Sequence, residues 1–239
     1  MKTFRMIVPA LSFVAMALAP LYGGTADLTS RRVQCEGSEY RYFLFSPGKG
    51  DPHEPWPALL MLHGAGDQAS NFIETWTHMA ARQHIVLIAP DLPRDPKFED
   101  VAPKVFRCVV QDAMQQVTLD RQRIYVFGHS MGGYLAYDAA MFDSDYFAAV
   151  AVHAMFISEE YLWIFGHATR KTPIAIYSGD QDPFVPIQKV RETRDRLVKA
   201  GFPVHFIEME GHDHNYYAVA DDVNEGAWKF LSGQQLPAH

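Results

Sequence analysis

The chain has 239 residues, of which 48% are hydrophobic, enough for one large domain with a substantial core but too few for two. Residues 27–239 carry 19 basic and 28 acidic residues, a net charge of −9, and such a surface repels nucleic-acid phosphates and anionic lipid headgroups. The sequence also has no basic cluster with interleaved aromatic residues, so composition argues against nucleic acid as a partner.

The amino terminus has the order of a secretory signal peptide. Lys2 and Arg5 precede an apolar run at 6–21, and small residues follow it. We expect residues 1–26 to be removed and residues 27–239 to form the domain of a secreted or periplasmic protein. The alternative, a membrane anchor, requires a run that is barely long enough to span, so no stable anchor is expected.

Hydrophobic periodicity predicts strands and helices in alternation. Two alternating segments, 32–35 and 39–45, predict an antiparallel hairpin around Gly37-Ser38. Apolar runs then predict strands at 58–62, 85–89, 124–127, 148–152, 173–177 and 204–208. Helices are expected at 71–82, 101–117, 134–140, 185–200 and 216–231. This order predicts an α/β fold in which helices flank a mostly parallel central sheet, with the hairpin at one edge.

Two features of this plan stay open. Cys35 and Cys108 are the only cysteines; in an oxidising compartment they could form a disulfide or remain two separate buried thiols. The connection at 155–172 holds more apolar side chains than a plain loop needs. It is predicted to form either a short helix packed on the core or a wall of a substrate pocket made by Phe156 and Trp163, and it is too short for a large lid.

The strand at 124–127 runs directly into Gly128-His129-Ser130-Met131-Gly132-Gly133, and a helix-like segment follows. A buried strand, a Gly-x-Ser-x-Gly motif and a helix are together typical of a nucleophile elbow, a strained turn that exposes its serine at the end of the sheet. Side chains at Gly128 and Gly132 would collide with the neighbouring strand and helix. Ser130 is the predicted nucleophile; an ordinary glycine-rich turn is the alternative.

A serine nucleophile needs a base and an acid that orients the base, and both types of residue follow later strands. Asp182, in the loop after the strand at 173–177, is the expected acid; Asp180 is the second candidate, and either could instead cap the next helix. The last strand ends near His212 and His214, one of which should be the base. A zinc site built from these histidines with His63 and His129 is the competing interpretation, although an elbow serine requires no metal.

The oxyanion of a tetrahedral intermediate needs two backbone N–H donors. Met131, the residue after the serine, is expected to supply one of them. Ala65, in the His63-Gly64-Ala65 turn after the strand at 58–62, is expected to supply the other.

Four motifs carry a resemblance to the α/β-hydrolase superfamily over essentially the whole of 27–239. They are the elbow at 128–133, Leu-His-Gly-Ala-Gly at 62–66, Gly-Asp-Gln-Asp-Pro-Phe-Val-Pro at 179–186 and Glu-Gly-His-Asp-His at 210–214. The chain is similar to compact esterases of the polyhydroxybutyrate depolymerase-like, feruloyl and acetylxylan esterase, dienelactone hydrolase and esterase D types. In the esterase D type the catalytic histidine lies in Asp-His-Ser-Tyr-Tyr; the match at 213–217 has Asn215 for the serine, and the resemblance favours His214.

The resemblance implies a serine hydrolase of carboxylic esters, with Ser130, His214 and Asp182 as a triad, a small-molecule or polymer ester as substrate, and neither cofactor nor metal. Together with the signal peptide, it implies a secreted enzyme. Two other functions fit the same fold. One is a serine peptidase of the prolyl-oligopeptidase type, although its propeller domain is absent from the sequence. The other is a non-catalytic binding protein.

Overall fold

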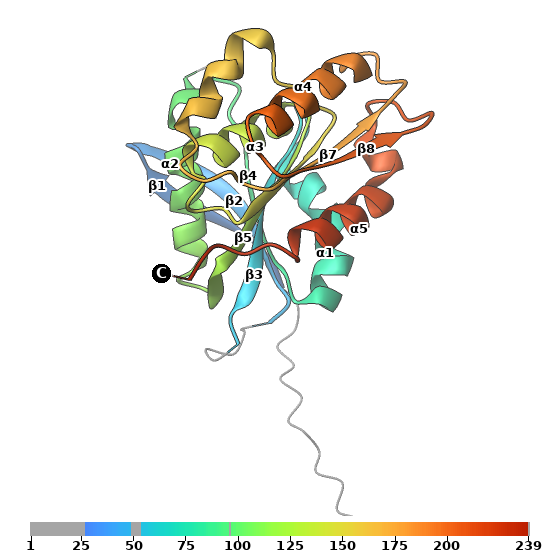
Figure 1. Ribbon diagram of the computed structural model, residues 1–239. Coiled ribbons are helices and arrows are strands. Elements are labelled where there is room, and N and C mark those ends of the chain that lie inside the picture. The colour runs from blue at the N-terminus through green and yellow to red at the C-terminus, as the bar shows by residue number, and fades with distance from the viewer. Residues whose placement is uncertain (1–26, 49–53, 96, 239) are drawn as a thin grey trace, which may run out of the picture.

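The computed structural model describes residues 27–48, 54–95 and 97–238, and eight strands of this part form one twisted sheet (Figure 1). Their order across the sheet is β1-β2-β4-β3-β5-β6-β7-β8. The strands are β1 (Asp27–Cys35), β2 (Ser38–Ser46), β3 (Trp56–Leu62), β4 (Val86–Pro90), β5 (Leu119–His129), β6 (Ala149–His153), β7 (Ile174–Gly179) and β8 (Val204–Met209).

The pairing confirms the predicted fold class. β1 pairs antiparallel with β2, and β2 pairs antiparallel with β4, whereas all the remaining pairs are parallel. The hairpin expected at 32–45 is therefore real, lies at one edge and extends over 27–46. The carboxyl ends of the parallel strands meet at one rim, which is where ligands bind in sheets of this kind.

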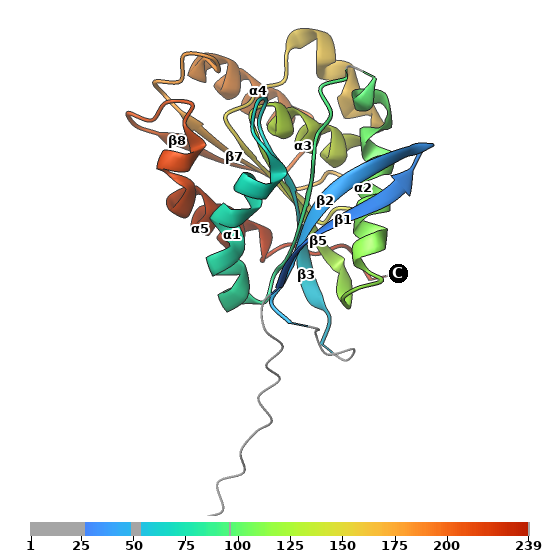
Figure 2. The same ribbon diagram turned by 180° about the vertical axis from the view of Figure 1, so that it is seen from behind.

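Helices cover both faces of the sheet (Figures 1 and 2). One face carries α1 (Ala69–Gln83) and α5 (Ala220–Leu231), and the other carries α2 (Phe98–Ala113), α3 (Met131–Phe142) and α4 (Ile187–Lys199). The central strands are buried on both sides because successive side chains point to opposite faces. In β3, Leu60 packs under α2 and α3, while Leu59 and Met61 pack under α1.

Two helices depart from their predicted bounds by four residues at one end, more than the other helices do. The helix expected at 101–117 begins at Phe98, whose ring packs against Tyr40 and Phe106, and it ends at Ala113, before a turn that leads to buried Val117. The helix expected at 216–231 is broken at Val219 into a short 3₁₀ helix, η2 (Tyr216–Ala218), and α5. Apolar periodicity continued through both breaks because some apolar residues there are partly or wholly buried without being α-helical, namely Met114, Val117, Tyr216 and Val219.

A disulfide joins the edge hairpin to the helical layer. Cys35, the last residue of β1, is bonded to Cys108 in α2, with 6.2 Å between the Cα atoms. Of the two alternatives that the sequence left open, a disulfide and two separate thiols, the structure has the disulfide.

The connection from β6 to β7 contains one regular element, the 3₁₀ helix η1 (Glu159–His167), so the segment expected at 155–172 is a short helix and not a large lid. The signal peptide expected at 1–26 lies outside the described residues. None of the helices in the described ranges is both long and apolar enough to cross a membrane.

Candidate active site

The motif at 128–133 folds as a sharp turn between β5 and α3. Ser130 has φ 53° and ψ −120°, a conformation that L-residues rarely adopt, and α3 begins at the next residue. A Cβ on Gly128 would collide with the backbone of Gly132 in α3, and a Cβ on Gly132 would collide with the carbonyl of Leu62 in β3. Both glycines are therefore required, as predicted, and the turn presents Ser130 at the rim of the sheet.

An unbroken line of hydrogen bonds joins Ser130, His214 and Asp182. His214 Nδ1 lies 2.7 Å from Asp182 Oδ2, and His214 Nε2 lies 2.9 Å from Ser130 Oγ. Because an ionised carboxylate can only accept, Nδ1 carries the proton and Nε2 is left to accept the hydroxyl proton of Ser130. The three residues come from positions 130, 182 and 214, and each follows the end of a parallel strand.

The loop that carries Asp182 holds its carboxylate in the orientation that contacts His214. Its side chain is fully buried, and its second oxygen, Oδ1, accepts hydrogen bonds from the backbone N–H groups of Phe184 and Val185, each at 2.9 Å. Asp180, the second candidate, instead accepts from the N–H of Gly211 at 2.8 Å and so stabilises the turn after β8. The structure therefore brings Asp182, and not Asp180, to the histidine.

The predicted oxyanion turn faces the same space. A cavity of about 300 Å³ is bounded by Gly64, Ala65 and Gly66 on one side and by Ser130 and His214 on the other. Met131 is the first residue of α3, and the first N–H groups of a helix have no acceptor within the helix. His63 holds the turn in place, because its Nε2 accepts from the N–H of Leu92 at 3.1 Å and its Nδ1 lies 2.9 Å from the carbonyl of Gly64.

Comparison with known proteins fits this geometry. Residues 59–175, which contain the turn after β3 and the elbow, match the model of the alpha/beta hydrolase family. The chain has the α/β-hydrolase fold.

Solved structures show the same fold for this hydrolase. A thermostable esterase superposes with a TM-score of 0.71 at 23% identity, over 87% of this chain and 63% of that one. An S-formylglutathione hydrolase from Staphylococcus aureus superposes with a TM-score of 0.71 at 17% identity, over 90% of this chain and 99% of that one. An uncharacterized protein of Mycobacterium tuberculosis is 33% identical over 86 residues, 34% of this chain. The match spans 24% of that relative's length.

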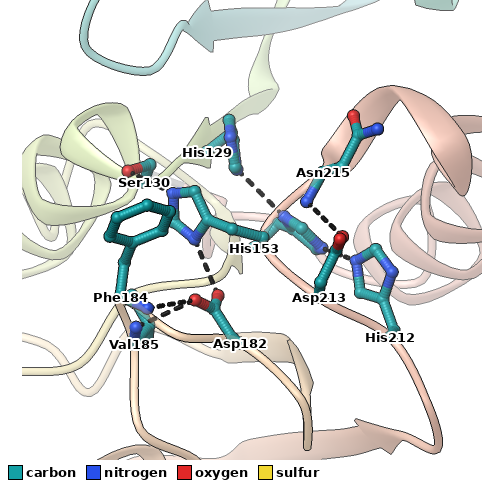
Figure 3. A network of polar contacts seen from close by, with 10 residues as sticks. His129, Ser130, His153, Asp182, Phe184, Val185, His212, Asp213 and Asn215 are labelled. Carbon is teal, nitrogen blue, oxygen red and sulfur yellow. Dashed lines mark hydrogen bonds and ion pairs between the residues drawn. The ribbon is translucent and has the colours of Figure 1, made fainter.

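Three further histidines of the hydrolase form a chain behind the site that the sequence did not predict (Figure 3). His129 Nδ1 lies 2.9 Å from His153 Nδ1, and His153 Nε2 lies 3.2 Å from His212 Nε2. All three side chains are buried. His129 and His153 are paired in the register of β5 and β6, a contact that requires the strand order and not only the sequence.

Burial keeps the imidazoles of His129 and His153 neutral. It lowers the pKa of His129 to about 4, with a further lowering from the charge of His214, and it lowers the pKa of His153 well below the usual value. A neutral His153 has one N–H, so it donates to one neighbour and accepts from the other. His212 contacts His153, whereas His214 contacts Ser130. Only His214 is therefore in position to act as the base.

The metal interpretation receives no support from these positions. Across 27–48, 54–95 and 97–238, no group of three or more histidine, cysteine, aspartate or glutamate side chains is arranged to hold a metal ion. His63 uses both ring nitrogens on backbone groups, as described above.

The two residues expected to form a pocket wall have different surroundings. Phe156 is half-buried against the core, whereas Trp163 is 57% exposed on η1 and lines a second cavity between α2, α3 and η1. The other residues that line the cavity at Ser130 are Asp67, His129, Asn215, Tyr216 and Tyr217. Tyr217 donates a hydrogen bond to Asp67 across the cavity edge. Both tyrosines belong to the Asp-His-Asn-Tyr-Tyr stretch at 213–217, in which only the histidine was assigned a role from the sequence.

Proposed function

We propose that this hydrolase cleaves carboxylic esters through Ser130. The observation that carries the proposal is the line from Ser130 through His214 to Asp182, with distances of 2.9 and 2.7 Å. A base within this distance of a hydroxyl can take its proton as the oxygen attacks a carbonyl. The esterases among the solved structures of the same fold support an ester as the substrate class.

The reaction follows from the positions of the donors and acceptors. Ser130 Oγ forms a bond to the ester carbonyl carbon while its proton passes to His214 Nε2, and buried Asp182 stabilises the resulting imidazolium. The N–H groups of Ala65 and Met131 are the proposed donors to the oxyanion. His214 then protonates the leaving alkoxide, which departs as the alcohol, and leaves Ser130 acylated. Water, deprotonated by His214, releases the acid and restores the serine.

The decisive experiment compares Ser130→Ala with the parent on a panel of p-nitrophenyl esters of increasing chain length. We expect kcat to fall by about 10⁴-fold or more, because the nucleophile is lost, and covalent labelling by a fluorophosphonate to disappear. Ser232→Ala changes an exposed serine at the end of α5 and is the matched control. Undiminished turnover by Ser130→Ala would disprove the proposal, and cleavage of peptides in place of esters would favour the peptidase interpretation.

We also propose that the protein is exported after removal of residues 1–26. The bond between Cys35 and Cys108 supports this proposal, because disulfides persist in oxidising compartments. Amino-terminal sequencing of protein recovered from periplasm or medium should give Asp27 as the first residue. An intact Met1 in the mature protein would contradict it.

A further inference from the structure

A second cavity, of about 330 Å³, lies between α2, α3 and η1, and the proposed ester hydrolysis does not use it. Carboxylates and aromatic rings share its wall: Glu99 from α2, Tyr134, Asp138 and Phe142 from α3, and Tyr161 and Trp163 from η1. Its volume is in the range of small-molecule sites. We call it the acidic aromatic cavity.

Asp138 is the residue that calls for an explanation. It is 6% exposed and borders the cavity, and no side chain or backbone N–H of the described residues donates a hydrogen bond to it. Burial and then the charge of Glu99 raise the pKa of its carboxyl to about 7. A largely buried carboxylate that borders a cavity and accepts no hydrogen bond is stabilised when a positive group enters that cavity. Glu99 likewise has no ion-pair partner within the described ranges, so both carboxylates are available to a ligand.

The aromatic residues provide the second observation. Tyr134 and Tyr161 meet edge to face with 5.3 Å between ring centroids, and Phe142 and Trp163 meet at 6.1 Å. Trp163 is 57% and Tyr161 is 37% exposed, so two large rings remain accessible beside the carboxylates. The face of an aromatic ring carries partial negative charge and attracts cations, most strongly for tryptophan.

We propose that the acidic aromatic cavity binds an organic ammonium ion, held by the carboxylates of Asp138 and Glu99 and by the rings of η1. An anion would be repelled by both carboxylates. A metal ion needs several oxygen, nitrogen or sulfur ligands close together, and the described residues provide no such group. An alkylammonium ion presents positive charge and apolar surface at once, which matches both kinds of wall.

The site is separate from the reacting serine. Ser130, Tyr134 and Asp138 follow one another at intervals of four residues along α3, so eight residues at 1.5 Å each place Asp138 about 12 Å from Ser130 along the helix axis. Binding to Ser130→Ala should therefore equal binding to the parent. The binding measurement can therefore fail or succeed independently of whether Ser130 hydrolyses esters, the proposed function on which this inference does not depend.

The test is calorimetric titration at pH 8 and low ionic strength with choline, alongside 3,3-dimethylbutan-1-ol, which has the same shape without the charge. We expect saturable binding of choline with a Kd at least several-fold below that of the alcohol. Asp138→Asn should weaken choline binding about tenfold or more, and Trp163→Ala should weaken it about three- to thirtyfold, the range of a cation–π contact. Asp195→Asn, on the exposed surface of α4, removes the same charge and should leave Kd unchanged.

Three results would overturn the inference: equal binding of the alcohol and choline, unchanged affinity in folded Asp138→Asn, or no saturable binding of choline. Circular dichroism shows whether each variant is folded. If Asp138→Asn does not fold, Glu99→Gln replaces it, because Glu99 is exposed and its loss should still weaken choline binding several-fold. Unchanged affinity in Glu99→Gln would then count against the proposal in the same way.

Discussion

Two histidines separated by one residue point to opposite sides of the same turn. His214 reaches Ser130 and Asp182, whereas His212 reaches His153 in the interior. The turn is held in this orientation because Gly179 at the end of β7 has no side chain, and a Cβ there would collide with the backbone carbonyl of His212. That carbonyl also accepts a hydrogen bond from the N–H of Gln181 at 3.0 Å.

Replacing each histidine by alanine should therefore have unequal effects. We expect His214→Ala to lower kcat for ester hydrolysis by about 10³-fold or more, because the base is lost. His212→Ala removes a buried side chain that bonds to His153, so it should lower stability by about 1–3 kcal/mol and leave kcat within about tenfold of the parent. Steady-state kinetics and urea unfolding measure the two effects. An inactive His212→Ala together with an active His214→Ala would reverse the assignment.

Asp138 should make stability depend on pH in a direction opposite to that of the buried histidines. The pKa of its carboxyl is about 7 in the folded protein against an ordinary value of 3.8, so between these values the folded protein holds a proton that the unfolded chain has released. Its contribution to stability is fully present below about pH 4 and is lost as the pH rises to about 7. In Asp138→Asn this contribution is absent, because asparagine does not titrate.

The free energy of unfolding of Asp138→Asn, relative to the parent, should therefore increase from pH 4 to pH 8 by roughly 2–4 kcal/mol. Urea unfolding of both proteins across this range measures the difference. The contributions of His129 and His153, whose lowered pKa values favour stability at higher pH, cancel in the comparison. Parallel profiles for the two proteins would show that the pKa of Asp138 is not raised.

At the scale of elements, the site depends on how closely α3 approaches β3. The helix can begin directly after Ser130 because Gly132 lies against the carbonyl of Leu62. The turn after β3 also lies beside the elbow, because a Cβ on Gly64 would be 3.5 Å from the Cβ of Ser130. Strand, elbow and helix therefore form one rigid unit that holds the serine and the proposed oxyanion donors together.

Alanine at Gly132 should disrupt this unit. Its methyl group would force β3 and α3 apart, so we expect Gly132→Ala to lower the free energy of unfolding by about 3 kcal/mol or more and to reduce ester hydrolysis. Gly166→Ala in η1 is the control, since no atom lies within 4 Å of the added methyl group, and it should change stability by less than about 1 kcal/mol. Urea unfolding of Gly132→Ala and Gly166→Ala measures the two changes in stability. Equal stabilities would contradict the close packing.

The elements that sequence reasoning located best are those with one dominant signal. The strand expected at 85–89 is β4 at Val86–Pro90, because a continuous apolar run bounded by turn residues has few alternatives. The helix α2 begins three residues before the predicted start at residue 101, which places Pro103 inside the helix and not in its first turn, the position that proline prefers. The gain from packing Phe98 outweighs this preference, and such packing depends on tertiary neighbours.

Some residues of the candidate site could be predicted from the sequence and others could not. Ser130, Asp182 and His214 could be predicted because each follows a strand end, and parallel strands end at one rim. The contact between His129 and His153 depends on the register of β5 with β6. The burial of Asp138 depends on which helices cover α3. Sequence periodicity carries neither kind of information, so both features emerged only from the structure.

The whole molecule is closed by one covalent link across distant parts of the chain. Cys35 and Cys108 are separated by 73 residues, and closing such a loop is expected to stabilise the fold by about 4 kcal/mol in the chain-entropy model. A reducing agent should therefore lower the Tm of the parent by several degrees. A protein in which both cysteines are replaced by alanine should already melt lower and should not respond to the reducing agent. Two reactive thiols in the unfolded, unreduced parent would rule out the bond.

The position of that bond also determines how the molecule would extend under a mechanical load. Cys35 ends β1 at the tip of the edge hairpin, so a pull on Asp27 can peel β1 from β2 only as far as the bond. Beyond it, the force passes directly to α2 and bypasses the 72 residues between the two cysteines (36–107), which include β2, β3, α1 and β4. At about 3.4 Å per residue, the oxidised chain withholds roughly 250 Å of contour length that the reduced chain would release.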